Sequence, residues 1–158
     1  MTFYSLNNNL FRLNISKDDI GNIDIFDYDD VKSFIYKMLK KHITKYNLKG
    51  LLFLDIYIDN YYGMIIDIKK KDNFLQKEYV EVKITFHLNN IFLYKVDYFD
   101  VIENTNIKHQ KIYYYKDNYY LEIINEVSDN DYLKLLEISN IIYNNNEEII
   151  KKGTQLFI

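Results

Sequence analysis

The sequence contains no cysteine, proline or tryptophan, and Arg12 is its only arginine. The absence of cysteine excludes disulfides, thiolate metal sites and thiol nucleophiles. Alanine is also absent, whereas asparagine, isoleucine, lysine and tyrosine are abundant. AT-rich codons encode these four residues, so the bias indicates an AT-rich genome, for which we expect a bacterial source. The number of tyrosines and asparagines therefore carries little functional information.

Length and charge exclude several further classes of protein. The 158 residues are 48% hydrophobic, which suits one compact domain or two half-size modules rather than a disordered chain. The net charge of −3, from 23 acidic and 20 basic residues, gives no argument for nucleic acid or for an anionic membrane. No apolar run approaches a membrane span and the N-terminus lacks signal-peptide features, so we expect a cytoplasmic protein.

Catalytic motifs are missing from the sequence. His42, His87 and His109 have no second ligand at zinc-motif spacing, and we expect them on a helix face, on a strand and in a loop. The four glycines stand alone, so no phosphate-binding loop is present, and no serine lies in a nucleophile-elbow context. We therefore predict no catalytic residues, no cofactor and no metal.

Three carboxylates could form a metal site, and a small enzyme that uses scattered acids such as Asp55 and Asp67 is a further alternative. Asp55, Asp59 and Asp67 flank a predicted hairpin, where they could converge. Asp59 is more simply a turn residue, and the other two suit solvent-facing positions. Convergence of these acids in a pocket would support the enzyme, and separated acids at the surface would argue against it.

The first half predicts a hairpin, a helix and a second hairpin. Apolar runs at 3–6 and 10–15 flank a turn of asparagines. Residues 29–46 have the clearest helical periodicity, with acids at the start and lysines near the end. Residues 51–58 read as a strand buried on both faces, and 64–68 as its partner.

The second half begins with a half-buried strand at 80–88, where apolar and polar residues alternate. A tyrosine-rich hairpin is expected at 113–123, followed by a helix from Ser128 to Tyr143. The tyrosines could stack on bases, but packing between strands explains them better because basic residues are few. Residues 154–158 suit a last strand. The segment 89–104 fits either a strand or a helix.

These patterns predict the α+β class, with two small, largely antiparallel sheets that are each covered by a long helix. The two halves would then be related as a duplicated unit. We expect an N-terminal module at 1–71, a short charged linker at 72–78 and a C-terminal module at 79–158.

The order of these segments resembles the MecA family of adaptor proteins, which deliver substrates to the ClpC unfoldase. The resemblance rests on five segments of the sequence: SLNNNLFRLNISKDDI, DYDDVKSFIYKMLKKHI, GLLFLDIYIDNYYGMIIDI, KIYYYKDNYYLEI and SDNDYLKLLEISNIIYN. They cover most of the chain at the level of pattern.

The resemblance implies a non-enzymatic adaptor with two protein partners. Residues 1–71 would capture client proteins, and 79–158 would bind the AAA+ unfoldase. The unfoldase surface would use the acids around the second helix: Glu126, Asp129, Asp131, Glu137, Glu147 and Glu148. A solvated helix face with acids near its positive end explains the same residues without a partner.

A second binding hypothesis is a single-target inhibitor, such as a toxin-immunity protein. Such an inhibitor needs one high-affinity surface and no unfoldase. The formation of a ternary complex distinguishes it from an adaptor, which must hold two partners at once.

Overall fold

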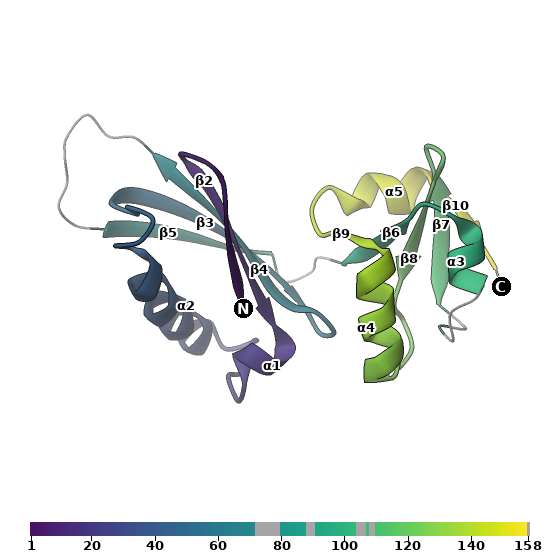
Figure 1. The fold of residues 1–158 in the computed structure, drawn as a ribbon, viewed down its shortest axis with the longest axis horizontal. Coiled ribbons are helices and arrows are strands. Elements are labelled where there is room, and N and C mark those ends of the chain that lie inside the picture. Colours follow the sequence, from purple (N-terminus) through teal and green to yellow (C-terminus); the bar gives the residue numbers. More distant parts are fainter. Residues whose placement is uncertain (72–79, 88–90, 104–106, 108–109, 158) are drawn as a thin grey trace. The chain divides into compact units, whose positions relative to one another are not determined.

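The computed structural model describes residues 1–71, 80–87, 91–103, 107 and 110–157. They belong to two compact units, Met1–Leu88 (unit 1) and Asn89–Ile158 (unit 2), each with a five-stranded sheet. Figure 1 shows the elements of both units. Two largely antiparallel sheets with helices packed on them confirm the predicted α+β class.

Unit 1 is built on sheet 1, in which the strand order is β1-β2-β4-β3-β5. All neighbours are antiparallel except β3 and β5, which are parallel. Its elements are β1 (Thr2–Asn7), β2 (Leu10–Ser16), α1 (Lys17–Ile20), α2 (Tyr28–His42), β3 (Gly50–Asp59), β4 (Gly63–Lys71) and β5 (Val80–His87). Both predicted hairpins, β1–β2 and β3–β4, are confirmed.

Helix α2 confirms the predicted first helix, although it ends at His42 rather than Tyr46. The carboxylate of Asp27 caps its N-terminus by accepting the backbone N–H groups of Asp29 and Asp30 at 2.9 and 3.0 Å. Such a cap stabilises a helix by about 1 kcal/mol. The acids of the first turn and the lysines of the last turn both interact favourably with the helix dipole.

The core of unit 1 lies between the helices and one face of sheet 1. On β3 the even-numbered residues Leu52 to Ile58 are buried, whereas the odd-numbered residues Leu51 to Tyr57 are only half-buried. The prediction that this strand is buried on both faces is therefore wrong, because both helices of unit 1 pack on the same face. Helix α2 contributes Val31, Ile35, Met38 and Leu39 to this core, and α1 contributes Ile20.

The turn between β3 and β4 brings the backbone of two hairpins together. Asp59 Oδ1 accepts the backbone N–H groups of Tyr61 and Tyr62, both at 2.8 Å. Burial raises the pKa of Asp59, and these two hydrogen bonds oppose the rise. Next to the turn, Gly63 has φ +114° and lies against the backbone of Ile15 and Lys17. A side chain has no room there.

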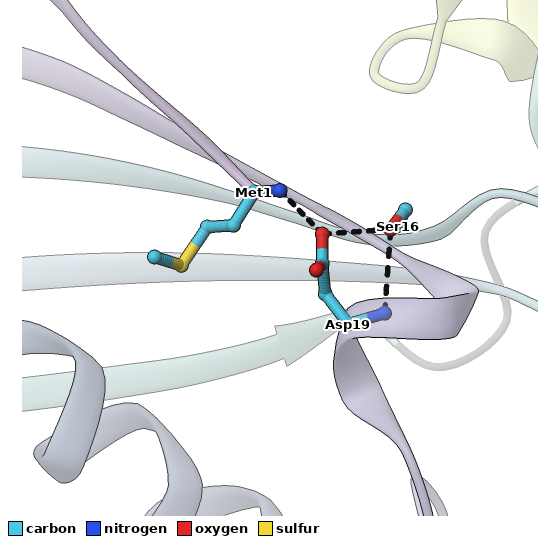
Figure 2. Close-up of polar contacts among 3 residues, drawn as sticks. All are labelled: Met1, Ser16 and Asp19. Carbon is cyan, nitrogen blue, oxygen red and sulfur yellow. Dashed lines mark hydrogen bonds and ion pairs between the residues drawn. The ribbon is translucent and has the colours of Figure 1, made fainter.

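The amino group of Met1 contacts a carboxylate of the short helix α1 (Figure 2). Ser16 caps α1: its Oγ accepts the backbone N–H of Asp19 at 3.3 Å and donates to Asp19 Oδ2 at 2.7 Å. The amino group of Met1 pairs with the same carboxylate. The amino group and then Ser16 lower the pKa of Asp19.

The strand β5 corrects the predicted module boundary. The sequence analysis assigned residues 79–158 to the C-terminal module, yet Val80–His87 pairs in parallel with β3 of sheet 1. The two units divide at residues 88 and 89 instead. The predicted alternation of β5 is confirmed, because Val80, Val82, Ile84 and Phe86 pack against the core of unit 1. The predicted linker at 72–78 lies outside the described residues.

Unit 2 is built on sheet 2, in which the strand order is β10-β7-β8-β6-β9 and all neighbours are antiparallel. Its elements are β6 (Leu93–Val96), α3 (Phe99–Glu103), β7 (Lys111–Tyr115), β8 (Asn118–Glu122), α4 (Asp129–Ile138), β9 (Asn140–Ile142), α5 (Asn146–Lys152) and β10 (Thr154–Leu156).

The structure defines the described part of the ambiguous segment 89–104 and corrects the end of the second predicted helix. The described part of the segment 89–104 forms both alternatives in turn, first the strand β6 and then the short helix α3. Helix α4 begins after Ser128 as predicted, but it ends at Ile138 rather than Tyr143. The chain becomes extended at Ser139, and Asn140–Ile142 then pairs with β6. Strand pairing has overridden the helical periodicity of this stretch.

Sheet 2 carries helices on both faces. Tyr94 of β6 contacts Tyr132 of α4, with their hydroxyl groups 2.9 Å apart. Leu93, the preceding residue, packs in a cluster with Ile149 of α5. Because successive side chains of a strand point to opposite faces, α4 and α5 lie on opposite sides of sheet 2. Figure 1 agrees with this arrangement.

The tyrosine-rich hairpin β7–β8 packs within unit 2, as the sequence analysis favoured. Tyr113 and Tyr120 are cross-strand partners, and both are buried. The hydroxyl of Tyr113 donates to the buried carboxylate of Glu122 at 2.7 Å. Burial, followed by the adjacent Glu122, raises the pKa of Tyr113. Its hydroxyl therefore stays protonated and keeps the acid satisfied.

The two sheets share part of their topology. The order β2-β4-β3-β5 of sheet 1 corresponds to β6-β8-β7-β10 of sheet 2, and in both units a helix precedes the hairpin. This common order is what a duplicated unit would produce. The last strand differs, being parallel to its neighbour in unit 1 and antiparallel in unit 2. Among the described residues, no helix is both long and apolar enough to cross a membrane.

Substitution of Gly63 tests the close approach of the two hairpins. A Cβ atom there would lie 2.4 Å from the carbonyl oxygen of Ile15, so we expect Gly63→Ala to lower the free energy of unfolding by about 3 kcal/mol. Gly21→Ala is the matched control, because Gly21 also has positive φ but a Cβ atom added there would meet nothing within 4 Å. Urea denaturation measures both. Equal losses for the two variants would contradict the steric account.

His42 is expected to make stability depend on pH. Both of its ring nitrogens are shielded from solvent and have no hydrogen-bond partner among the described residues. Burial, then the charges of Lys45 and Lys41, lower the pKa of His42 below its ordinary value of 6.5. The unfolded chain therefore binds this proton more readily, and stability falls as the pH drops below about 6.5.

The variant His42→Phe isolates this effect, because a phenyl ring can keep the stacking on Phe3, whose ring centroid is 4.6 Å away. We expect the variant to lose part of the decline in unfolding free energy between about pH 6.5 and pH 5. Urea denaturation at each pH measures the decline. An unchanged pH profile, or an NMR titration that places the pKa of His42 above 6.5, would contradict the prediction.

Candidate functional site

Unit 1 presents the face of sheet 1 opposite α2, which we call the outer face. None of the described helices of unit 1 packs on it, because α1 and α2 share the core on the other side. The register places Phe53, Asp55 and Tyr57 of β3 on this face together with Asp67 of β4 and Lys83 of β5. The outer face is therefore a broad surface of mixed aromatic and charged side chains.

A row of four charged or polar side chains crosses the outer face. Arg12 Nε donates to Asp67 Oδ1 at 2.8 Å, and its Nη2 lies 3.5 Å from Asp67 Oδ2. Asp55 is the cross-strand partner of Asp67, and its Oδ1 is 3.0 Å from His87 Nε2. The ring of His87 stacks on Tyr57, with centroids 4.4 Å apart and an interplanar angle of 8°.

The arrangement of the row offsets the repulsion between its two carboxylates. Two carboxylates on directly opposed positions of neighbouring strands repel one another. Arg12 flanks Asp67 on one side and His87 flanks Asp55 on the other, so each carboxylate has a partner away from its neighbour. The side chains of Asp67 and Asp55 are 18% and 46% exposed, so solvent also screens the repulsion.

The structure brings together only two of the three acids that were considered for a metal site. Asp55 and Asp67 are neighbours on the outer face, whereas Asp59 caps the following turn through the hydrogen bonds to Tyr61 and Tyr62. Within the described ranges, no three histidine, aspartate or glutamate side chains are grouped so that they could hold a metal ion. Asp67 instead pairs with Arg12, and Asp55 shares a hydrogen bond with His87, both at partly exposed positions.

Unit 2 presents the solvent-facing side of α4. Leu133 and Ile138 are large apolar residues that are 57% and 42% exposed. Asp129 and Glu137 lie one helical turn before and after Leu133, and both are exposed. We call these four residues, together with Lys134, the α4 face. Exposed apolar residues next to acids on one helix suit contact with another protein.

The six predicted protein-binding acids do not form one surface. Asp129, Asp131 and Glu137 belong to α4, and Glu126 lies just before it, whereas Glu147 and Glu148 belong to α5 on the opposite side of sheet 2.

Three of these acids have structural partners. Asp131 hydrogen-bonds the capping Ser128 at 2.6 Å. Glu147 lies 3.4 Å from Lys151, and Glu148 lies 3.1 Å from Lys152 and accepts the hydroxyl of Tyr115 at 2.8 Å. Glu126, Asp129 and Glu137 are exposed and have no ion pair with a described residue. These three remain the candidates for contact with a partner.

No pattern in the sequence predicted the roles of Arg12 and His87 or the exposure of Leu133 and Ile138 on α4. Arg12 is the single arginine of the chain, which was the only signal available for it. Its pairing with Asp67 depends on the register of β2 with β4, which no local pattern encodes. His109 lies outside the described residues.

In the comparisons with known proteins, no protein-family model, no curated protein and no solved structure matches this chain. The resemblance to the MecA family therefore stays a prediction from the sequence.

Substitution of Arg12 tests the electrostatic account of the row. We expect Arg12→Gln to lower the free energy of unfolding by about 1 kcal/mol, because the guanidinium of Arg12 no longer offsets the repulsion between Asp67 and Asp55. Adding Asp67→Asn should restore most of this loss. A double-mutant cycle in urea, with Asp67→Asn alone as the fourth member, measures the coupling. Additive effects of the two substitutions would contradict the account.

Proposed function

We propose that the protein is a cytoplasmic, non-enzymatic adaptor that presents client proteins to a ClpC-type AAA+ unfoldase. Unit 1 binds the client and unit 2 binds the unfoldase. The observation that carries the proposal is the division of the chain into two compact units, each with its own sheet and its own exposed surface of mixed apolar and charged residues.

The α4 face supports the role of unit 2. Burying Leu133 and Ile138 against a partner removes apolar surface from water, and each fully buried leucine or isoleucine side chain is worth about 2 kcal/mol. Asp129 and Glu137, one helical turn before and after Leu133, would orient a partner that carries lysine or arginine. Because Leu133 is 57% exposed in the free protein, its removal should affect binding much more than folding.

The outer face of sheet 1 supports the role of unit 1. Its aromatic residues Phe53 and Tyr57 provide contact area, and the flanking charges provide specificity. Adaptors need two surfaces because a bound client gains a high effective concentration near the unfoldase only while both contacts hold. Two surfaces on two separate units satisfy this requirement without competition for one site.

Capture experiments with the full-length chain test the proposal. The immobilised protein is incubated with a purified ClpC-type unfoldase from the same cell. We expect capture of the unfoldase, and we expect Leu133→Ser combined with Glu137→Lys to weaken it by about tenfold or more. Asp97→Lys is the matched control, because Asp97 is an exposed acid of unit 2 outside the α4 face. This control should bind like the unaltered protein.

Each outcome discriminates between the candidate functions. Unfoldase capture that depends on the α4 face, together with client degradation that requires this protein, supports the adaptor. Failure of the unaltered protein to bind the unfoldase contradicts it. A single tight partner that binds in the absence of any unfoldase would favour the inhibitor, such as a toxin-immunity protein.

A further inference from the structure

One end of the outer face of sheet 1 combines lysines with apolar residues. Phe53 of β3 lies directly between Lys69 of β4 and Lys83 of β5. Two residues earlier on β3, Leu51 is the cross-strand partner of Lys71. We call these five residues the lysine-rimmed patch. Because residues two apart on a strand share a face, all five side chains belong to one surface.

Glu81 of β5 is the cross-strand partner of Leu51 and shares this face, so this end of the face brings together three lysines and one acid. Lys69, Lys71 and Lys83 are exposed and form no ion pair within the part of the chain that the structure describes. Lys83 Nζ lies 5.8 Å from the ring centroid of Phe53, within reach of a cation–π contact. Lysines elsewhere do find acids, as Lys151 and Lys152 do on α5. A local excess of positive charge around an aromatic ring favours a negatively charged ligand.

The neighbouring carboxylates indicate which negatively charged ligand fits. Asp67 lies two residues from Lys69 on β4, and Asp55 lies two residues from Phe53 on β3, so both share the face of the patch. A nucleic-acid backbone carries a phosphate at every nucleotide and would meet these carboxylates as it crossed the face. A protein segment can instead place its acids over the lysines and uncharged side chains elsewhere.

We propose that the lysine-rimmed patch binds an acidic, apolar segment of the client protein. This inference rests on the proposed function, in which unit 1 captures clients. Carboxylates of the segment lie against Lys69, Lys71 and Lys83, while its apolar side chains pack on Phe53 and Leu51. The charges steer the encounter and the apolar contacts hold the complex.

Fluorescence anisotropy with the full-length protein tests the inference. The probe is a labelled peptide of alternating glutamate and leucine, and the comparison peptide carries lysine in place of every glutamate. We expect the acidic peptide to bind more tightly than the basic one, and its binding to weaken as salt rises because exposed charges are screened. Lys69→Glu combined with Lys83→Glu should weaken binding of the acidic peptide by about tenfold or more.

The matched control is Lys37→Glu combined with Lys49→Glu, which reverses two exposed lysines of unit 1 outside the patch. It should bind the acidic peptide like the unaltered protein. The neutral variant Lys69→Gln with Lys83→Gln should show an intermediate affinity, and thermal unfolding should confirm that each variant is folded. If the charge-reversed variant does not fold, the inference is tested by the affinity of the neutral variant and by the comparison of the acidic and basic peptides.

Four results would overturn the inference. They are equal binding of the two peptides, equal loss in the control variant, tighter binding of single-stranded oligothymidylate than of the acidic peptide, and a dimer of this chain that dissociates when the patch is altered. The last would identify a second copy as the occupant. Unfoldase capture through the α4 face does not involve the patch, so its persistence would show that only the client inference had failed.

Discussion

The described helices of unit 1 cover sheet 1 on one side only, and the rest of the described part of unit 1 depends on this constraint. Helix α2 and the single turn α1 bury one face of the sheet, so the even-numbered residues of β3 form the core. The odd-numbered residues of β3 must then lie on the outer face. This arrangement leaves three groups on the outer face: the ion pair of Arg12 with Asp67, the hydrogen bond between His87 and Asp55, and the lysines around Phe53. Charged side chains can remain there because a face that no described helix covers stays in contact with water.

In unit 2 the helices cover the sheet differently. Helices α4 and α5 pack on opposite faces of sheet 2, and the exposed side of α4 presents the apolar residues Leu133 and Ile138 to solvent. The two units thus expose different kinds of surface, one a sheet face and the other a helix face. This difference is the physical reason for assigning them different partners.

Local sequence patterns predicted the helices and strands better than they predicted which strands pair with one another. The period of 3.6 residues placed α2, and the turn asparagines and glycines placed both hairpins of unit 1. The alternation in Val80–His87 identified which side chains face the core, but it could not show that this strand joins β3 rather than the second sheet. The site was missed for the same reason, since Arg12 meets Asp67 and His87 meets Asp55 only through strand register. The helix predicted from Ser128 to Tyr143 extends beyond the end of α4, because the pairing of β9 with β6 cannot be predicted from the local sequence.

The central claim is that the two units bind different proteins, and site-specific cross-linking tests it most directly. The chain has no cysteine, so a single introduced cysteine carries a photoactivatable cross-linker at one defined position. Thr85→Cys places it on the outer face of sheet 1, and Leu133→Cys places it on the α4 face. In a mixture of client and unfoldase, the account predicts that Thr85→Cys cross-links to the client and Leu133→Cys to the unfoldase. Cross-linking of both positions to the same protein, or of neither position to any protein, would contradict it.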